Sequence, residues 1–212
     1  MVGGLIQKEK RKIILTEGIP IEITDTNNNK TNSIGLIGRA SKQFMNSLSL
    51  EENRRGYFLP ETKLDNGYLV HNKVTGENYL CIAVYPETYK NSVLSIVTHM
   101  FVCNCVININ SVQDIWDDYG NKTTQLVKKC ENELCYIQQV STELRQTDPG
   151  IHKDAQFIIY TKFTDINLLD TIELVNEKVS VKVIDNITFA FKGIAKVQVK
   201  LETRNIEGGG GG

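Results

Sequence analysis

Two segments of the chain, Tyr57–Cys103 and Phe157–Leu201, follow the same succession of apolar and polar stretches, although they are far apart in the sequence. Each has a short strand-like stretch, a polar turn, a hairpin and a long final strand. The hairpin bend contains Gly76 in the first segment and Asn176 in the second, each followed by glutamate. Internal repetition of a supersecondary unit predicts two related modules packed in one body.

The clearest strands are predicted in the second segment. Between Lys178 and Val183, valines alternate with lysines and a serine, and between Ala195 and Glu202 apolar residues again alternate with polar ones. A period of two is typical of a strand with one buried and one solvated face. Two such neighbouring strands predict an antiparallel sheet that is covered on one side only.

The long apolar stretch of the first segment has a different pattern. From Ser95 to Ile109, apolar residues occupy both the odd and the even positions. This pattern predicts one strand that is buried on both faces, against its own barrel and against something else. Either the second module or another subunit could provide that second contact.

The sequence therefore predicts a mainly β protein, with two small related β-barrel or β-sandwich modules joined by irregular segments and with little helix. Residues 1–56 are expected to form an N-terminal arm, a hairpin and a long loop, and 57–112 the first module. Residues 113–150 are expected to connect the modules, 151–205 to form the second module, and 206–212 to be a flexible glycine tail.

Three local features refine this prediction. Asn27–Asn29 is expected to be a hairpin turn, and Gly38–Arg55, which lacks a clear periodicity, a long loop with one helical turn at most. Residues 123–140 fit either a helix, from the spacing of their apolar side chains, or two strands joined at Glu131–Glu133. We favour two strands because the flanking sequence is rich in strand patterns.

The overall charge makes some functions less plausible. The 24 basic and 25 acidic residues give a formal net charge of −1. A free-standing nucleic-acid binder normally has a basic excess, although a local basic patch remains compatible with this balance. No apolar stretch approaches the ~20 residues that span a bilayer, and a secretory signal pattern is absent at the N-terminus, so a soluble protein without membrane contact is expected.

The five cysteines are the residues that most suggest chemistry. In a chain without an export signal they are expected to be reduced thiols. Cys103 and Cys105, with Cys130 and Cys135, match the ligand count of a zinc site, but their spacing is not that of zinc knuckles. We interpret them as small core residues, and we predict no metal or cofactor. His99 lies on the strand face expected for Cys103 and Cys105, but too far along the strand for a nucleophile and base pair.

Basic residues near the N-terminus form the sharpest charge feature. They cluster before the first predicted strand, and two further arginines end the long loop. Such groups are either a solvated arm or contacts with an acidic neighbour or with nucleic-acid phosphates. The candidate interface or DNA contacts are therefore Lys8, Lys10, Arg11, Lys12, Arg54 and Arg55.

The succession DINLLDTIELVNEKVSVKVID from Asp165 to Asp185, followed by GIAKVQVKLETR from Gly193 to Arg204, resembles the neck proteins of tailed bacteriophages. In that family an aspartate opens a strand, as Asp170 does here, and a later strand ends in a hydrophobic residue and an aspartate. The earlier YFLPETKLDNGYLVHNKVTGENYLCIAV has the same character. Head-closure members of the family are commonly shorter and have one barrel, whereas two modules are predicted here. The position of this protein within the neck or tail is therefore left open.

The resemblance implies a structural virion protein that forms a ring in the head-to-tail connector, around the DNA channel. It implies a homo-oligomer in contact with portal and tail proteins, non-specific contact with packaged DNA, assembly in the host cytoplasm, and no catalytic residue. A tail terminator or another tail or baseplate component is a related alternative. A second alternative is a cellular β-barrel module whose peptide or carbohydrate pocket is lined by Trp116, Tyr119 and Tyr57. A thiol or metal enzyme is the least favoured hypothesis.

Overall fold

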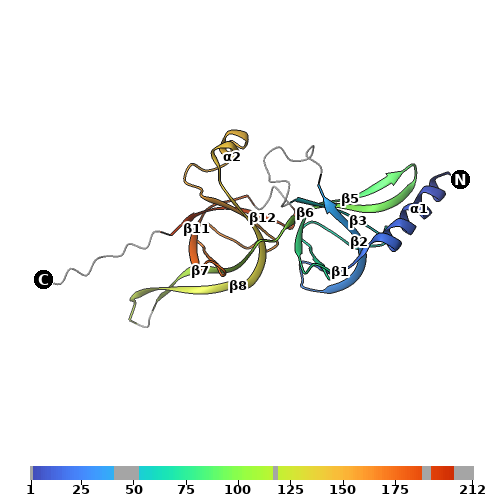
Figure 1. The fold of residues 1–212 in the computed structure, drawn as a ribbon. Helices are drawn as coiled ribbons and strands as arrows, with labels where there is room; N and C mark the ends of the chain where they lie inside the picture. Colours follow the sequence, from blue (N-terminus) through green and yellow to red (C-terminus); the bar gives the residue numbers. More distant parts are fainter. Residues whose placement is uncertain (1, 41–52, 117–118, 188–191, 203–212) are drawn as a thin grey trace.

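The computed structural model describes residues 2–40, 53–116, 119–187 and 192–202. Over these ranges the chain forms two closed barrels of six strands each, with helix α1 (Val2–Glu17) against the first barrel and the short helix α2 (Thr142–Thr147) beside the second (Figure 1). The predicted fold class, mainly β with two small barrel modules and little helix, is confirmed.

The first barrel is antiparallel throughout, and it closes because β1 pairs with both β2 and β4. Its strands follow one another around the barrel in the order β1-β2-β3-β6-β5-β4. Their bounds are β1 (Ile19–Thr24), β2 (Lys30–Arg39), β3 (Asn53–Phe58), β4 (Leu69–Asn72), β5 (Asn78–Tyr89) and β6 (Ser92–Val102).

The second barrel repeats this topology. Its order is β7-β8-β9-β12-β11-β10, which is the order of the first barrel with every strand number raised by six. The two segments that look alike in the sequence correspond to the last four strands of each barrel. The bounds are β7 (Cys105–Trp116), β8 (Lys122–Gln139), β9 (Phe157–Thr161), β10 (Thr171–Leu174), β11 (Val179–Asn186) and β12 (Ala195–Leu201).

The barrels are larger than the modules expected from the sequence at 57–112 and 151–205. The first begins at Ile19, because the β1–β2 hairpin completes it, and the second begins at Cys105, because β7 and β8 close it. Residues 113–150 therefore supply barrel wall as well as connection. Sequence alternation detects a strand without identifying its neighbours, so the first two strands of each barrel were left outside the repeat.

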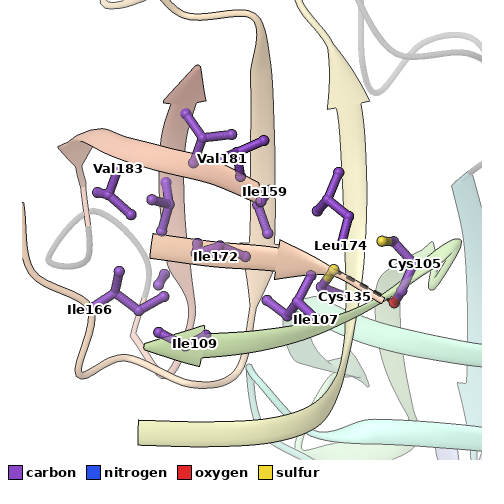
Figure 2. Packing of buried hydrophobic residues seen from close by; sticks show 13 residues of the cluster. Cys105, Ile107, Ile109, Cys135, Ile159, Ile166, Ile172, Leu174, Val181 and Val183 are labelled. Carbon is purple, nitrogen blue, oxygen red and sulfur yellow. Dashed lines mark hydrogen bonds between the residues drawn. The ribbon is translucent and has the colours of Figure 1, made fainter. Parts of the chain in front are cut away.

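Each barrel has its own apolar interior. The second is filled mainly by β-branched side chains from all six strands and the adjoining turn, including Ile107, Ile159, Ile172 and Val181 (Figure 2). The predicted alternation is confirmed there, since Val181 and Val183 point inward. In the first barrel Phe58, Met100 and Tyr79 are the largest interior side chains.

A third apolar cluster joins the barrels. Phe101 of β6 lies with Leu80 of β5 against Tyr136 of β8, Ile158 of β9 and Tyr160 of β9. The centroid of the Phe101 ring is 4.6 Å from that of Tyr136 and 5.0 Å from that of Tyr160. This junction explains the apolar residues on both faces of β6, and it identifies the second module as the additional neighbour.

The single strand expected from Ser95 to Ile109 is instead two strands in two barrels. β6 ends at Val102 and β7 begins at Cys105, so Cys103 and Asn104 alone connect the barrels. The Asn104 side chain bonds to the backbone N–H of Ile137, at 2.8 Å, and to its carbonyl oxygen, at 2.9 Å. The connection is therefore attached to β8 and is not a free linker.

Backbone contact reinforces the junction at Gly67 and Gly193. Both glycines have positive φ, +81° and +74°. A Cβ atom on Gly67 would lie 2.0 Å from the carbonyl oxygen of Gly193. Side chains are excluded at this point, which allows the two barrels to approach closely. Nearby, Lys192 forms an ion pair with Asp65 across the same junction.

The predicted turn at Asn27–Asn29 is confirmed. Asp25 accepts hydrogen bonds from the backbone N–H groups of Asn27 and Asn29, and Asn28 has a positive φ of 64°. The predicted loop Gly38–Arg55 is shorter at both ends, because β2 continues to Arg39 and β3 begins at Asn53. The rest of that prediction, and the glycine tail 206–212, lie outside the described residues.

Residues 122–139 form one strand, β8, and not a helix. The favoured strand structure is confirmed, but the break expected at Glu131–Glu133 is a bulge within that strand. Opposite Ile107–Asn110 the register with β7 shifts twice, and Asn132 takes a positive φ of 53°. Bulges bend a strand and increase its twist, so the outer part of the β7–β8 hairpin turns away from the barrel wall.

Asp170 and Asp185, both in the segment compared above with neck proteins, have structural roles. Asp170 is buried, accepts a hydrogen bond from the backbone N–H of Asn167 at 2.8 Å and pairs with Lys129 at 2.9 Å. It thereby fixes the turn that leads into β10. Asp185 follows a bulge in β11 and accepts a hydrogen bond from the Gln198 amide at 2.7 Å.

Candidate interaction surface

The N-terminal basic residues lie on a helix and not on an extended arm. Lys8, Lys10, Arg11 and Lys12 belong to α1, which packs against β6 and β2 of the first barrel and buries Ile14 completely. The sequence did not predict this helix, because few of its side chains are buried and the basic run KEKRK shows no apolar helical periodicity. Lys8 and Lys12 are exposed, and Lys10 is half-buried.

Tyr57 brings together two of the candidate cations. The ammonium group of Lys10 is 5.0 Å from the centroid of the Tyr57 ring, and the guanidinium of Arg55 is 5.1 Å from it. Both distances are within the range of cation–π attraction. Residues from α1 and β3 are thus held on one aromatic side chain, which the sequence alone did not indicate.

Glu87 of β5 anchors this arrangement. Its carboxylate forms an ion pair with Lys10 and accepts a hydrogen bond from the Ser95 hydroxyl at 2.7 Å. Partial burial acts to raise the pKa of Glu87, but the contacts with Lys10 and Ser95 outweigh it and leave the pKa below the ordinary value. The carboxylate therefore stays charged, and it holds α1 against the barrel at neutral pH.

Two other candidates also have acidic neighbours in the same chain. Arg11 pairs with Glu61 at 2.7 Å, and Arg54 lies 3.8 Å from Glu77. Contact with Arg11 lowers the pKa of Glu61 through a side-chain hydrogen bond. The six candidates therefore do not form a single uniform patch. Lys8 and Lys12 point to solvent on α1, whereas Arg54 and Arg55 lie within β3.

Arg39 adds a cation that the sequence analysis did not select. In the β2–β3 register Arg39 lies opposite Arg54, and Gly38 opposite Arg55. Arg39 is exposed, and with Arg55 and Tyr57 it lines a shallow groove of about 470 Å³. Like charges directly opposite in a sheet are unfavourable, and here Glu77, 3.8 Å from Arg54, offsets the repulsion. The two cations that share the groove are therefore Arg39 and Arg55. The shared cross-strand position, not visible in the sequence, was needed to identify Arg39.

A larger groove lies between α1 and the barrel. Its volume is about 540 Å³, and its walls are mostly apolar. Leu5 and Ile13, which form part of the wall, are 62% and 51% exposed. Large apolar side chains exposed together are typical of surfaces that bind another molecule. The lining residues are Leu5, Ile6, Glu9, Lys10, Ile13, Ile14, Leu36, Tyr57 and Glu87.

A second exposed apolar surface lies on the other barrel. Beyond Asn110, β7 pairs with β8 alone, and every described residue from Val112 to Leu126 is exposed. Val112 and Leu126 face each other across the two strands, and Trp116, on the same face, is 65% exposed. We call this segment the β7–β8 arm. Figure 1 shows it extending from the second barrel, at the end away from α1.

The aromatic residues suggested for a ligand pocket do not converge. Tyr57 lies beside α1 on the first barrel, whereas Trp116 and Tyr119 belong to the β7–β8 arm of the second. Neither of the latter lines the groove that contains Tyr57. The pocket proposed for a peptide or carbohydrate from these three side chains is therefore not formed.

The cysteines are distributed over the two barrels and their connection. Cys105 lies opposite Cys135 in the β7–β8 register, and both are buried in the second interior. Cys103 lies between the strands and not inside one, as the sequence had suggested. Burial raises the pKa of Cys81 to about 12 and raises that of Cys103 strongly as well. Within the described ranges, no three His, Cys, Asp or Glu side chains are grouped as a metal site.

His99 faces Tyr85 and not a cysteine. The Tyr85 hydroxyl and His99 Nε2 are 3.1 Å apart, and the two rings are stacked with centroids 5.9 Å apart. Burial and the charge of Arg55 lower the pKa of His99. The ring is therefore neutral at pH 7 and packs against its neighbour as a structural side chain.

The chain matches no protein-family model and no curated protein. Among solved structures it is similar to protein SF1141 from Shigella flexneri 2a, with a TM-score of 0.40 and 11% identity over 48% of this chain and 95% of that one. It is also similar to MrkH of K. pneumonia in its apo state, with a TM-score of 0.22 and 9% identity over 96% of this chain and 87% of that one. At these TM-scores neither likeness bears on function. In the described part of the chain, neither helix is long and apolar enough to cross a bilayer.

Proposed function

We propose that this protein is a structural virion component of a tailed bacteriophage that forms a ring of identical subunits in the head-to-tail connector, around the DNA channel. The observation that carries the proposal is the pair of exposed apolar surfaces, the groove beside α1 and the β7–β8 arm, at opposite ends of a body made of two joined barrels. A subunit with two such surfaces can bind a neighbour on each side.

The junction between the barrels suits a mechanical role. Phe101, Tyr136 and Tyr160 form an apolar contact there, and the Gly67–Gly193 approach adds close backbone packing. Small or polar inter-domain interfaces permit movement, whereas an apolar, tightly packed one restricts it. Subunits in a ring that resists internal pressure need this stiffness. The protein would hold and connect its neighbours, without catalysing a reaction.

The charges support two kinds of contact. The exposed lysines of α1 are proposed to face neighbouring proteins, and Arg39 and Arg55, which line one groove, are proposed to face packaged DNA. With a net charge of −1 and two arginines in one groove, the chain is expected to bind DNA weakly and without sequence preference. Portal and tail proteins are the proposed partners above and below the ring.

The test is the assembly state of the purified full-length chain. Light scattering gives the mass of the particles, and negative-stain images show their shape. We expect closed annular particles of one copy number, and association with portal or tail proteins from the same virus. A strict monomer at high concentration that binds neither portal nor tail proteins would contradict the proposal.

A further inference from the structure

Two of the five cysteines face each other inside the second barrel. Cys105, the first residue of β7, lies directly opposite Cys135 of β8 in their antiparallel register, and both side chains point into the barrel interior (Figure 2). Residues directly opposite in an antiparallel pair have Cα atoms about 4.5–5.5 Å apart. A disulfide joins residues whose Cα atoms are about 4.4–6.8 Å apart. The backbone therefore already holds this pair at a separation that a disulfide can bridge.

The other cysteines are not placed in this way. Cys81 of the first barrel lies opposite a methionine of β6, and Cys130 of β8 lies opposite an isoleucine of β7. Cys103 lies in the connection between the barrels, before β7 begins. All five cysteines are free thiols in this structure. Among them, Cys105 and Cys135 are the pair that shares one cross-strand position.

The two thiols of this pair differ in acidity and in surroundings. A hydrogen bond with the Cys135 thiol lowers the pKa of Cys105, although burial and the nearby Glu177 carboxylate oppose this effect. The same contact, together with burial, raises the pKa of Cys135. The Cys105 sulfur lies 3.8 Å from a carboxylate oxygen of Glu177, an exposed residue of the turn between β10 and β11. Because the thiolate is the form that attacks a disulfide, Cys105 is the member of the pair that reacts first.

We infer that Cys105 and Cys135 are a reversible disulfide switch, open as two thiols under reducing conditions and closed as a cross-strand bond under oxidising ones. This inference goes beyond the proposed ring and does not depend on it. Both residues are buried, at 3% and 0% exposure, so a reagent reaches the sulfurs when the exposed turn at Glu177 opens locally. Exchange is therefore expected to be slower than at a surface thiol, and it does not require the barrel to unfold.

A small-molecule disulfide such as glutathione disulfide supplies the oxidant. The Cys105 thiolate attacks one of its sulfurs, which breaks the glutathione S–S bond, forms a mixed disulfide on Cys105 and releases one glutathione. Cys135 then loses its proton to solvent, and its sulfur attacks the Cys105 sulfur and releases the second glutathione. The two cysteine thiols lose two protons and two electrons, and glutathione disulfide gains both as it becomes two glutathione thiols.

The bond would lie where the chain enters the second barrel. Cys105 follows the two-residue connection, and Cys135 precedes Tyr136 of the apolar cluster between the barrels. The bond would close a loop of about 30 residues that contains the β7–β8 arm. The cytoplasm keeps thiols reduced, whereas the surroundings outside a cell favour disulfides. In the proposed virion the bond would therefore form after release from the host cell.

The test uses the full-length chain, purified with a thiol reductant and then held in buffers with different ratios of reduced to oxidised glutathione. Alkylation in denaturant labels the remaining thiols, and mass spectrometry of the digested chain identifies any linked peptides. Scanning calorimetry gives the melting temperature of each form. Cys105→Ala and Cys135→Ala each remove one partner, and Cys103→Ala and Cys130→Ala are the matched controls. Circular dichroism checks that each variant is folded.

We expect the unmodified chain to yield one linked peptide, between Cys105 and Cys135, as the share of oxidised glutathione rises, and a reductant to reverse it. Closing a loop of about 30 residues should raise the melting temperature by about 7–15 °C. Cys103→Ala and Cys130→Ala should behave in the same way. Cys135→Ala should accumulate a mixed disulfide with glutathione on Cys105, whereas Cys105→Ala should leave Cys135 as a thiol.

Three results would overturn the inference. Absence of the linked peptide even in fully oxidised glutathione, or its formation only after unfolding in urea, would mean that the two thiols serve as core packing alone. A bond from Cys103 to Cys135, or loss of the bond in Cys103→Ala, would assign the chemistry to the connection between the barrels. A bond between two chains would refute the intramolecular switch. Peptide mapping of the unmodified chain distinguishes these pairings even where a variant fails to fold.

Discussion

Replacing Phe101 with alanine should weaken the apolar contact between the two barrels. The side chain is 1% exposed and packs against the rings of Tyr136 and Tyr160, whose own centroids are 6.0 Å apart. Phenylalanine to alanine changes in a core cost about 3–5 kcal/mol in the free energy of unfolding. Because rigid barrels border this site and limit its collapse, we expect a value of about 4–5 kcal/mol.

In a chain of this length, each kcal/mol lowers the melting temperature by about 2–4 °C, so Phe101→Ala should lower it by about 8–20 °C. Scanning calorimetry provides the melting temperature, and urea unfolding followed by fluorescence provides the free energy. The loss of contact should also separate the unfolding of the two barrels into two transitions, since the connection by Cys103 and Asn104 transmits little on its own.

A double-mutant cycle tests whether the contact itself is responsible. Phe101→Ala and Tyr160→Ala, alone and together, should give a coupling free energy of about 0.5–1.5 kcal/mol, as measured for aromatic pairs. Phe58, which is fully buried inside the first barrel, provides the control. Phe58→Ala with Tyr160→Ala should be additive within about 0.5 kcal/mol. Absence of coupling in the first pair, or a cost below about 1 kcal/mol for Phe101→Ala, would refute the junction as described.

Three further predictions follow from individual contacts. Burial and the charge of Arg55 lower the pKa of His99 from 6.5. As the pH drops below about 6.5, the unfolded chain therefore takes up a proton before the folded chain does, and the free energy of unfolding should fall. His99→Gln should reduce the difference in urea midpoint between about pH 7.5 and 5.5, and an unchanged difference would contradict this. Gly67→Ala should lower the free energy of unfolding by at least about 1 kcal/mol more than Gly76→Ala. Both glycines have positive φ, but only at Gly67 would the added Cβ meet another backbone, that of Gly193. Equal losses of free energy in urea unfolding would contradict this close approach. Arg39→Gln with Arg55→Gln should reduce the slope of log K for DNA against log salt by about 2, because both cations line the proposed DNA-facing groove. Lys8→Gln with Lys12→Gln should leave that slope unchanged. The reverse result, from filter binding or fluorescence anisotropy, would place the DNA on α1.

The sequence predicted strands better than it predicted partners. Alternation at Val179–Val183 directly reports a buried face, so the β structure and the two modules could be inferred. Alternation does not identify the neighbouring strand, so the first two strands of each barrel were not assigned to it. The sequence does not reveal helix α1, because Ile14 is the one fully buried side chain among those described in it, from Gly4 to Glu17. Its charged surface has the composition of a solvated arm.

The candidate surface was predicted only in part. Lys10 and Arg55 were selected for their charge, but their meeting at Tyr57 depends on α1 packing beside β3, which local sequence does not specify. Arg39 was not selected because its pairing with Arg54 arises from the β2–β3 register. Trp116 and Tyr119 were predicted to be exposed aromatics. The bulges that direct their hairpin outward could not be predicted, because they arise from the register between β7 and β8.

The two-residue connection between the barrels has a mechanical consequence. With only Cys103 and Asn104 between β6 and β7, and with Asn104 bonded to Ile137, the chain has no slack with which one barrel could swing. A force applied to one barrel is then transmitted directly to the other. We therefore expect the angle between the barrels to be the same in every copy, and the diameter of the proposed ring to depend on that angle.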